Sequence, residues 1–199
     1  VTEVMEVNGF VANAGSMGTW SGAGMGTWSG AAINGTRPPC VNPTGFQLAT
    51  LALAAANTSR IRLGTGVAIA GTRLAPVIAH SIASVAKLAP GRTFLGIGTG
   101  HTAMRIMGQK PVGPSAFREY LRVVRGLLDG EEVDYTHSGE TRPIRFQDRQ
   151  LESLNLDDRI PIFVGANGPK ALAATRAYGD GRISAGTEPN LRHAEEHGP

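Results

Sequence analysis

Apolar residues recur with alternating helical and strand-like spacing between residues 43 and 185. The helical spacing predicts helices over residues 43–56, 76–88, 101–107, 115–128 and 169–178. Spacing of two and short apolar runs predict strands over residues 60–70, 93–97, 160–164 and 182–185. This order indicates parallel strands joined by right-handed crossovers, so the predicted fold class is α/β. An open doubly wound sheet and a β/α barrel both satisfy it.

Two of the predicted helices carry well-defined apolar faces. The helix that starts at Pro76 presents Val77, Ile78, Ile82, Val85 and Leu88. In the helix over 115–128, Ser115 is the predicted N-cap and the apolar stripe consists of Phe117, Leu121, Val124 and Leu128. A polar hairpin is predicted within residues 131–149, with its turn at 137–139.

The chain divides into three parts of unequal character. Residues 1–42 are rich in Gly and Ser, and the segment Met17–Gly22 returns unchanged, almost at once, as Met25–Gly30. Such a segment is expected to bury little surface. Residues 43–186 hold the alternating helices and strands, and residues 187–199 form a polar tail.

Composition narrows the classes of function. The chain has 199 residues, enough for one domain, and its net charge of +3 is spread along the sequence. No run of Lys or Arg with interleaved aromatic residues occurs, so nucleic acid is not an expected partner. Cys40 is the single cysteine, which excludes an internal disulfide and favours a reduced, cytoplasmic protein. No apolar run approaches the roughly 20 residues of a membrane span, so no membrane association is expected.

Two predicted strand ends are rich in glycine. One reads Gly64-Thr65-Gly66-Val67, and the other runs from Gly96 through Gly98 to Gly100. The second is not the Rossmann fingerprint, because its third glycine comes one residue early and no acidic residue ends a strand about 20 residues later. Since glycine lacks a Cβ, the two ends together favour a smooth floor for a planar ring. The alternative is a tight strand-to-helix turn that binds no ligand.

Residues 167–170 lie at a predicted junction from strand to helix. Helix N-termini bind phosphate readily, Gly168 permits close approach, and Lys170 adds charge, although an ordinary helix start is the alternative. His101 follows the second glycine-rich end and could act as a general acid or base near neutral pH, the alternative being a structural histidine. No spacing of His, Cys or carboxylate residues predicts a metal site, and the common hydrolase, zincin and P-loop motifs do not occur.

Several segments, taken in order and with their spacing, resemble the luciferase-like monooxygenases, especially the branch with deazaflavin-dependent dehydrogenases and reductases. The segments are Thr58–Val67, Leu95–Gly100, Phe117–Leu121, Ile160–Ala171 and Asp180-Gly181. The resemblance covers residues 43–185. It implies a TIM-type β/α barrel that holds FMN or a deazaflavin coenzyme at the carboxyl ends of its strands.

The resemblance also implies roles for individual residues. The cofactor-binding residues would be Thr65, Gly66, Val67, Gly98, Thr99, Gly100, Ala166, Asn167, Gly168, Pro169 and Lys170. A non-proline cis peptide would fall at Gly66–Val67, behind the ring. Sugar-phosphate dehydrogenases of the deazaflavin branch carry a glutamate as the acid after their Gly-Thr-Gly. This chain has His101 there, which keeps a proton donor but departs from the pattern for that substrate class.

The chain departs from the family at both ends. Residues 1–42 show no clear counterpart of the first barrel strands, and nothing after residue 186 supplies the last two. A complete barrel has about 250 residues, so we expect an incomplete one here, with about six of the eight strands or fewer. A truncated or reframed product and a shortened relative are the two explanations, and uninterrupted native ends in the source DNA would refute truncation.

The sequence leaves three functions open. The first is an oxidoreductase that uses a reduced flavin or deazaflavin for hydride transfer or oxygen activation on a small organic substrate, with His101 as the proton donor. The second is a non-catalytic flavin-binding protein. The third is an inactive, truncated barrel without a cofactor, whose open sheet edges are covered by self-association into a homo-oligomer.

Overall fold

The computed structural model describes residues 47–147, 152–166 and 168–183. The Gly/Ser-rich segment over residues 1–42, Asn167 and the polar tail over 187–199 lie outside the described residues. The same holds for the first residues of the helix predicted over 43–56 and the last residues of the strand predicted over 182–185.

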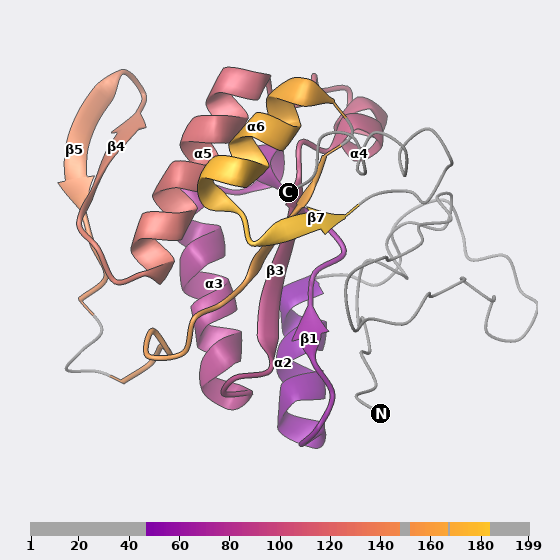
Figure 1. The fold of residues 1–199 in the computed structure, drawn as a ribbon, viewed down its shortest axis with the longest axis vertical. Helices are drawn as coiled ribbons and strands as arrows, with labels where there is room; N and C mark the ends of the chain where they lie inside the picture. The colour runs from indigo at the N-terminus through magenta and orange to yellow at the C-terminus, as the bar shows by residue number, and fades with distance from the viewer. Residues whose placement is uncertain (1–46, 148–151, 167, 184–199) are drawn as a thin grey trace, which may run out of the picture.

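A five-stranded parallel sheet stands at the centre of the described structure (Figure 1). Its strands are β1 (Leu63–Gly64), β2 (Ala68–Ile69), β3 (Thr93–Gly98), β6 (Ile162–Gly165) and β7 (Gly181–Ile183). The order across the sheet is β1-β3-β6-β7, and β2 also pairs with β3. Each later strand is therefore added on the same side of the strand before it.

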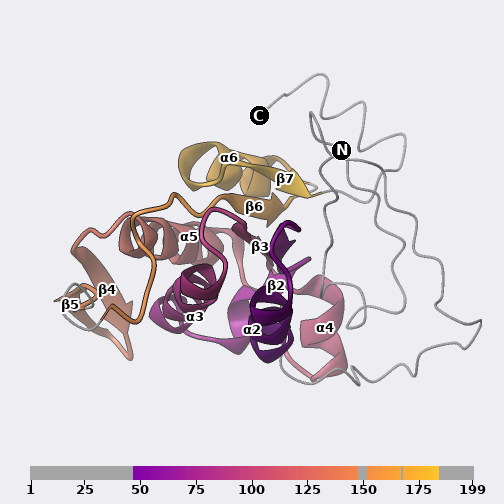
Figure 2. The same cartoon turned by 90° about the horizontal axis from the view of Figure 1, so that it is seen from below.

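Helices cover one face of this sheet. They are α2 (Gln47–Asn57), α3 (Ala75–Leu88), α5 (Pro114–Leu128) and α6 (Pro169–Tyr178), while the turn η2 (Ala70–Thr72) and helix α4 (His101–Ile106) follow strand ends. Figure 2 shows α2, α3, α5 and α6 on the same side of the strands. A doubly wound sheet reverses its strand order and carries helices on both faces, whereas a barrel winds in one direction with its helices outside. The described residues therefore have the geometry of part of a β/α barrel.

The hydrophobic core lies between the sheet and these helices. Alternate residues of β3 and β6 are fully buried in it, namely Leu95, Ile97, Ile162 and Val164. Because successive side chains of a strand point to opposite faces, Gly96 and Gly98 belong to the inner face of the barrel. Among the described residues, no helix is both long and apolar enough to cross a membrane.

Helix α3 forms where it is predicted, but its buried face differs from the expected one. Ile78, Ile82 and Val85 are buried, whereas Val77 and Leu88 are 47% and 51% exposed. Four alanines of the same helix are also buried, so the contact between the helix and the rest of the core is centred on the face that carries these alanines. The expected face was defined by large apolar residues alone. The observed face includes alanines, whose small side chains allow a helix to pack closely on a sheet.

Helix α5 buries its predicted stripe of Phe117, Leu121, Val124 and Leu128. Its N-cap is Gly113, and Pro114 is the first helical residue, so the prediction of Ser115 as the cap is wrong. Proline suits the first helical position, because the N–H that it lacks would have no partner within the helix.

The predicted hairpin is confirmed as the antiparallel pair β4 (Val133–His137) and β5 (Glu140–Ile144), beside α5 (Figure 1). Ser138 and Gly139 have φ angles of +54° and +83°, which the favoured two-residue hairpin turn requires. The guanidinium group of Arg122 on α5 donates to the carbonyl oxygen of Asp134. The hairpin is thus attached to the outer side of the helix layer.

Four charged side chains join α5 to the amino ends of β6 and β7. Asp180 accepts hydrogen bonds from the backbone N–H of Ile162 at 2.8 Å and from the guanidinium group of Arg159 at 2.6 Å. Arg125 is 8% exposed, and its Nη1 lies 3.6 Å from Asp180 and 3.5 Å from Asp129. Burial lowers the pKa of Arg125, while the two carboxylates act in the opposite direction.

Candidate active site

A bulge interrupts the first strand of the sheet on its way to the carboxyl edge. Gly64 pairs with Phe94 and Ala68 pairs with Ile97, so three residues (65–67) stand opposite two residues of β3 (95 and 96). The extra residue splits the single strand predicted over residues 60–70 into β1 and β2. The peptide bond between Gly66 and Val67 is cis, which confirms its predicted place. We refer to residues 65–67 as the bulge.

The glycines of β3 make room for the bulge. A Cβ on Gly96 would overlap the carbonyl oxygen of Thr65, and the hydroxyl of Thr65 donates to the carbonyl oxygen of Gly96 at 2.6 Å. Thr65 is 0% exposed, so this bond is made away from water. A Cβ on Gly98 would lie 3.2 Å from the side chain of Val67. Close packing of the bulge therefore requires a residue without a side chain at Gly96, and a side chain at Gly98 would press on Val67.

Gly165 of β6 continues the same surface. It pairs with Gly98, and a Cβ on it would lie 3.8 Å from the side chain of Val67. The sequence alone attributed the β3 glycines to direct contact with a planar ring. In the structure these glycines seat the bulge, so a ring placed on this face would meet Val67 before the backbone of Gly98.

Two phenylalanine rings fill the inner face nearer the amino ends of the strands. Phe94 and Phe163 pack edge to face with ring centroids 5.5 Å apart, and the guanidinium carbon of Arg62 lies 5.8 Å from the centroid of Phe94. A Cβ on Gly64 would overlap the Phe94 ring, and one on Gly181 would lie 2.8 Å from Phe163. Gly64, which the sequence assigned to the ring-binding floor, thus accommodates an aromatic side chain of the protein itself.

Helix α4 begins where β3 ends. Its N-cap, Gly100, has a φ angle of +74°, and a Cβ there would overlap the side chain of Ile69. His101 is the first residue of the helix and is exposed, while Thr99 before the cap is half-buried. Met104, 7% exposed, is the residue of α4 that anchors the helix.

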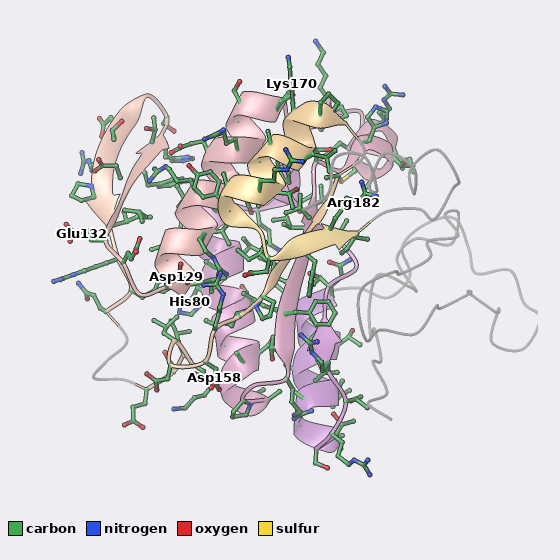
Figure 3. All side chains as sticks on the ribbon, in the orientation of Figure 1. His80, Asp129, Glu132, Asp158, Lys170 and Arg182 are labelled. Atoms are coloured by element: carbon green, nitrogen blue, oxygen red, sulfur yellow. The ribbon has the colours of Figure 1, made fainter. Side chains whose placement is uncertain are left out.

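The predicted phosphate site lies at the start of α6. Ala166 is buried, and its N–H donates to the carbonyl oxygen of Ile183 on β7 at 3.4 Å. Gly168 is the N-cap, and a Cβ on it would meet nothing within 4 Å. Pro169 and Lys170 are exposed, and Figure 3 shows Lys170 at one end of α6. Among the described residues, the space in front of Gly168 at this helix start is therefore open.

The register of the sheet brings these segments to one edge. Ile69, Gly98, Gly165 and Ile183 are Cα partners in successive pairs across the sheet. Since the carboxyl ends of parallel strands meet at one edge, the bulge, the start of α4 and the start of α6 border this edge together. The predicted residues found along it are Gly66, Val67, Gly98, Thr99, Gly100, His101, Ala166, Gly168, Pro169 and Lys170, whereas Thr65 is fully buried and bonded to Gly96, short of the edge.

Sequence reasoning missed the residues that hold this edge in place. The hydroxyl of Tyr120 on α5 donates to the carbonyl oxygen of Arg73, just after η2, at 3.0 Å. Burial raises the pKa of Tyr120, so the hydroxyl keeps its proton. A tyrosine beside the apolar stripe of α5 was the one signal available. Over residues 47–147, 152–166 and 168–183, no group of three or more His, Cys, Asp or Glu side chains could hold a metal ion.

The geometry agrees with a comparison against protein families, in which the model for luciferase-like monooxygenases matches residues 7–197. The chain belongs to this family. A 5,10-methylenetetrahydromethanopterin reductase from Methanolobus tindarius is 35% identical over 144 residues, which are 70% of this chain and 42% of the relative. An F420-dependent hydroxymycolic acid dehydrogenase from Mycobacterium tuberculosis is 35% identical over 146 residues, which are 70% of this chain and 39% of the relative.

A solved structure shows the same likeness to the luciferase-like family. The coenzyme F420-dependent tetrahydromethanopterin reductase from Methanopyrus kandleri superposes with a TM-score of 0.52 at 26% identity. The match covers 68% of this chain and 43% of that one. The chain thus spans about two fifths of the length of the luciferase-like relatives that it matches.

Proposed function

We propose that this chain binds a deazaflavin, coenzyme F420, at the carboxyl edge of its sheet and acts as an oxidoreductase on a small organic substrate. The observation that carries the proposal is the bulge of Thr65, Gly66 and Val67, seated on glycines of β3 and β6. It offers a surface with few side chains, bordered by an exposed histidine and by a helix start with free space around it.

Each part of the edge has a role in this proposal. The bulge supports one face of the ring, and residues 98–100 border the ring. The start of α6, with residues 166–170, binds phosphate, because its free N–H groups and its helix dipole favour an anion. His101 exchanges a proton with the substrate from the first position of α4.

The division of labour follows the usual logic of cofactor enzymes. A bound deazaflavin supplies the hydride chemistry, and the protein supplies orientation and electrostatics. Membership of the family supports a flavin or deazaflavin cofactor. The names of the dehydrogenase from Mycobacterium tuberculosis and the reductase from Methanopyrus kandleri include coenzyme F420, which supports the deazaflavin over FMN.

Titration of the purified protein with coenzyme F420, and separately with FMN, tests the proposal. We expect saturable changes in the absorbance and fluorescence of coenzyme F420 at one molecule per chain, and weaker binding of FMN. Anaerobic turnover is then measured with methylenetetrahydromethanopterin and the reduced coenzyme, and with a series of secondary alcohols and the oxidised coenzyme. Folded protein that binds neither cofactor contradicts the proposal, and binding without turnover favours a non-catalytic flavin-binding protein.

A matched pair of variants tests the phosphate site within the same titration. Gly168 and Gly113 are both N-caps before a proline, and a Cβ on either meets nothing within 4 Å. Serine is a good N-cap, so neither substitution should weaken its helix. Gly168→Ser should weaken binding of coenzyme F420 at least about tenfold, because its side chain occupies the space for the phosphate, whereas Gly113→Ser should leave affinity unchanged. Equal affinities of the two variants would place the phosphate elsewhere.

A further inference from the structure

The turn that follows β2 is fixed by a helix far away in the sequence. The hydroxyl of Thr72 donates to the carbonyl oxygen of Ile69 at 2.8 Å, which closes η2 onto the end of β2. One residue later, the carbonyl oxygen of Arg73 accepts the hydrogen bond from the hydroxyl of Tyr120. The ring of Tyr120 packs against the hydrophobic core, so its hydroxyl gives the turn a rigid point of attachment.

The same turn touches the helix that carries His101. A Cβ on Gly71 would lie 2.6 Å from Cε of Met104 and 3.1 Å from the side chain of Val112. These two side chains therefore rest on the backbone of Gly71, and Met104 is the buried anchor of α4. Helix α4 is thus seated against η2 as well as against the end of β3.

We infer that Tyr120 is a positioning residue of the proposed active site, because its hydroxyl, acting through η2 and Met104, sets where α4 holds His101 relative to the bulge. The catalytic role of His101 rests on the proposed function. The structural link from Tyr120 to α4 is independent of that function. The hydrogen bond of Tyr120 ends on the backbone of Arg73, which is not among the residues to which we assign cofactor binding, so its effect passes through the turn.

Amide hydrogen exchange in the coenzyme-free protein tests this link. The N–H of Met104 donates to Gly100 and that of Gln109 donates to Met104, so both amides report on α4. Tyr120→Phe keeps the ring and removes one hydroxyl. Exchange at these two amides should quicken roughly three- to tenfold, the factor that corresponds to one hydrogen bond. The amide of Asp180, which donates to Ile162 far from the turn, should keep its rate.

Tyr178→Phe is the matched control, because Tyr178 also packs partly against the core but belongs to the carboxyl end of α6. It should leave the exchange rates of Met104 and Gln109 unchanged. A second variant, Thr72→Val, removes the hydroxyl that closes η2 onto Ile69 and should quicken the same two amides while keeping the bond of Tyr120. Unchanged rates in Tyr120→Phe, or equal quickening of every amide, would overturn the inference.

Kinetics then connect the link to the reaction. Tyr120→Phe should lower the turnover number about three- to tenfold while the dissociation constant of coenzyme F420 stays within about twofold, because His101 is displaced and the bulge is not. A fall in affinity with unchanged turnover would contradict the positioning role. If the unaltered protein binds no coenzyme F420, the proposed function fails, and hydrogen exchange alone still decides the link.

Discussion

Gly96 and Gly98 show how one missing atom shapes the site at the scale of the residue. Both glycines lie on the inner face of the barrel, where the bulge presses against them. A glycine-rich strand end is commonly explained by contact with a ligand. Here the bulge of the protein itself contacts these glycines. They act on a bound ligand through the bulge, which would lie between them and the ligand.

Gly96→Ala tests this packing directly. Because the new Cβ would overlap the carbonyl oxygen of Thr65, the bulge must shift, and we expect a loss of about 1–3 kcal/mol in the free energy of unfolding. Urea denaturation measures this loss, with Gly113→Ser as a control that should stay within about 0.5 kcal/mol. Equal stability of Gly96→Ala and the unaltered protein would show that the bulge can move without cost.

His101→Gln separates binding from proton transfer. Glutamine keeps a polar side chain at an exposed position, so affinity for coenzyme F420 should stay within about threefold. Turnover should fall by about 10²–10⁴-fold, the usual contribution of a positioned acid or base. Steady-state kinetics at saturating coenzyme measure the effect, and turnover equal to that of the unaltered protein would exclude His101 as the proton donor.

At the scale of the element, short strands are placed by side chains beyond the strands themselves. The N–H of Asp180 donates to the carbonyl oxygen of Ile162, and its carboxylate accepts from the N–H of Ile162. Asp180, the residue directly before β7, thus holds the first residue of β6 in place through two hydrogen bonds. The register that follows pairs Gly165 with Ile183 at the other end of the strands.

Asp180→Ala should therefore destabilise the fold more than Arg159→Ala, which removes the exposed partner of Asp180. It leaves the N–H of Ile162 without this acceptor and the buried Arg125 with one carboxylate fewer, so we expect a loss of about 2–4 kcal/mol. Arg159→Ala removes a side chain that is 61% exposed and should cost less than about 1 kcal/mol. Urea unfolding of both variants gives the comparison, and similar losses would contradict the structural role of Asp180.

At the scale of the whole molecule, the proposed site draws on segments that are far apart in the sequence. The bulge, the end of β3 and the start of α6 share one edge because the strands are parallel and neighbouring. A ligand that contacts all three segments joins them, and it binds the folded chain in preference to the unfolded one.

Coenzyme F420 should therefore raise the free energy of unfolding of this chain. At about 100 times its dissociation constant, the expected gain is about 2.7 kcal/mol. The shift in the urea midpoint measures the gain at rising coenzyme concentration. Free riboflavin, which lacks the phosphate, serves as a comparison and should stabilise less. A midpoint that does not move at any concentration would contradict binding to the folded chain.

Much of the fold was predictable because local patterns specify helices and strands. The stripe of α5, the hairpin turn and the start of β3 all follow from apolar spacing and turn residues. The buried face of α3 was not predictable, because alanines make up much of its contact surface and contribute little to the hydrophobic periodicity. The split of the first strand was not predictable from periodicity either, because a bulge depends on the register of its neighbour.

By itself, the sequence determined the α/β class, the order of the elements and the residues at each strand end, because hydrophobic periodicity and glycine placement are local properties. Apolar spacing left a barrel and a doubly wound sheet open, and the family resemblance implied the barrel. The tertiary structure showed it directly, since the choice depends on the side to which each strand is added. It also decided what the glycines contact and which residues support α4. These contacts join positions as distant as Arg73 and Tyr120, and only the folded chain brings such positions together.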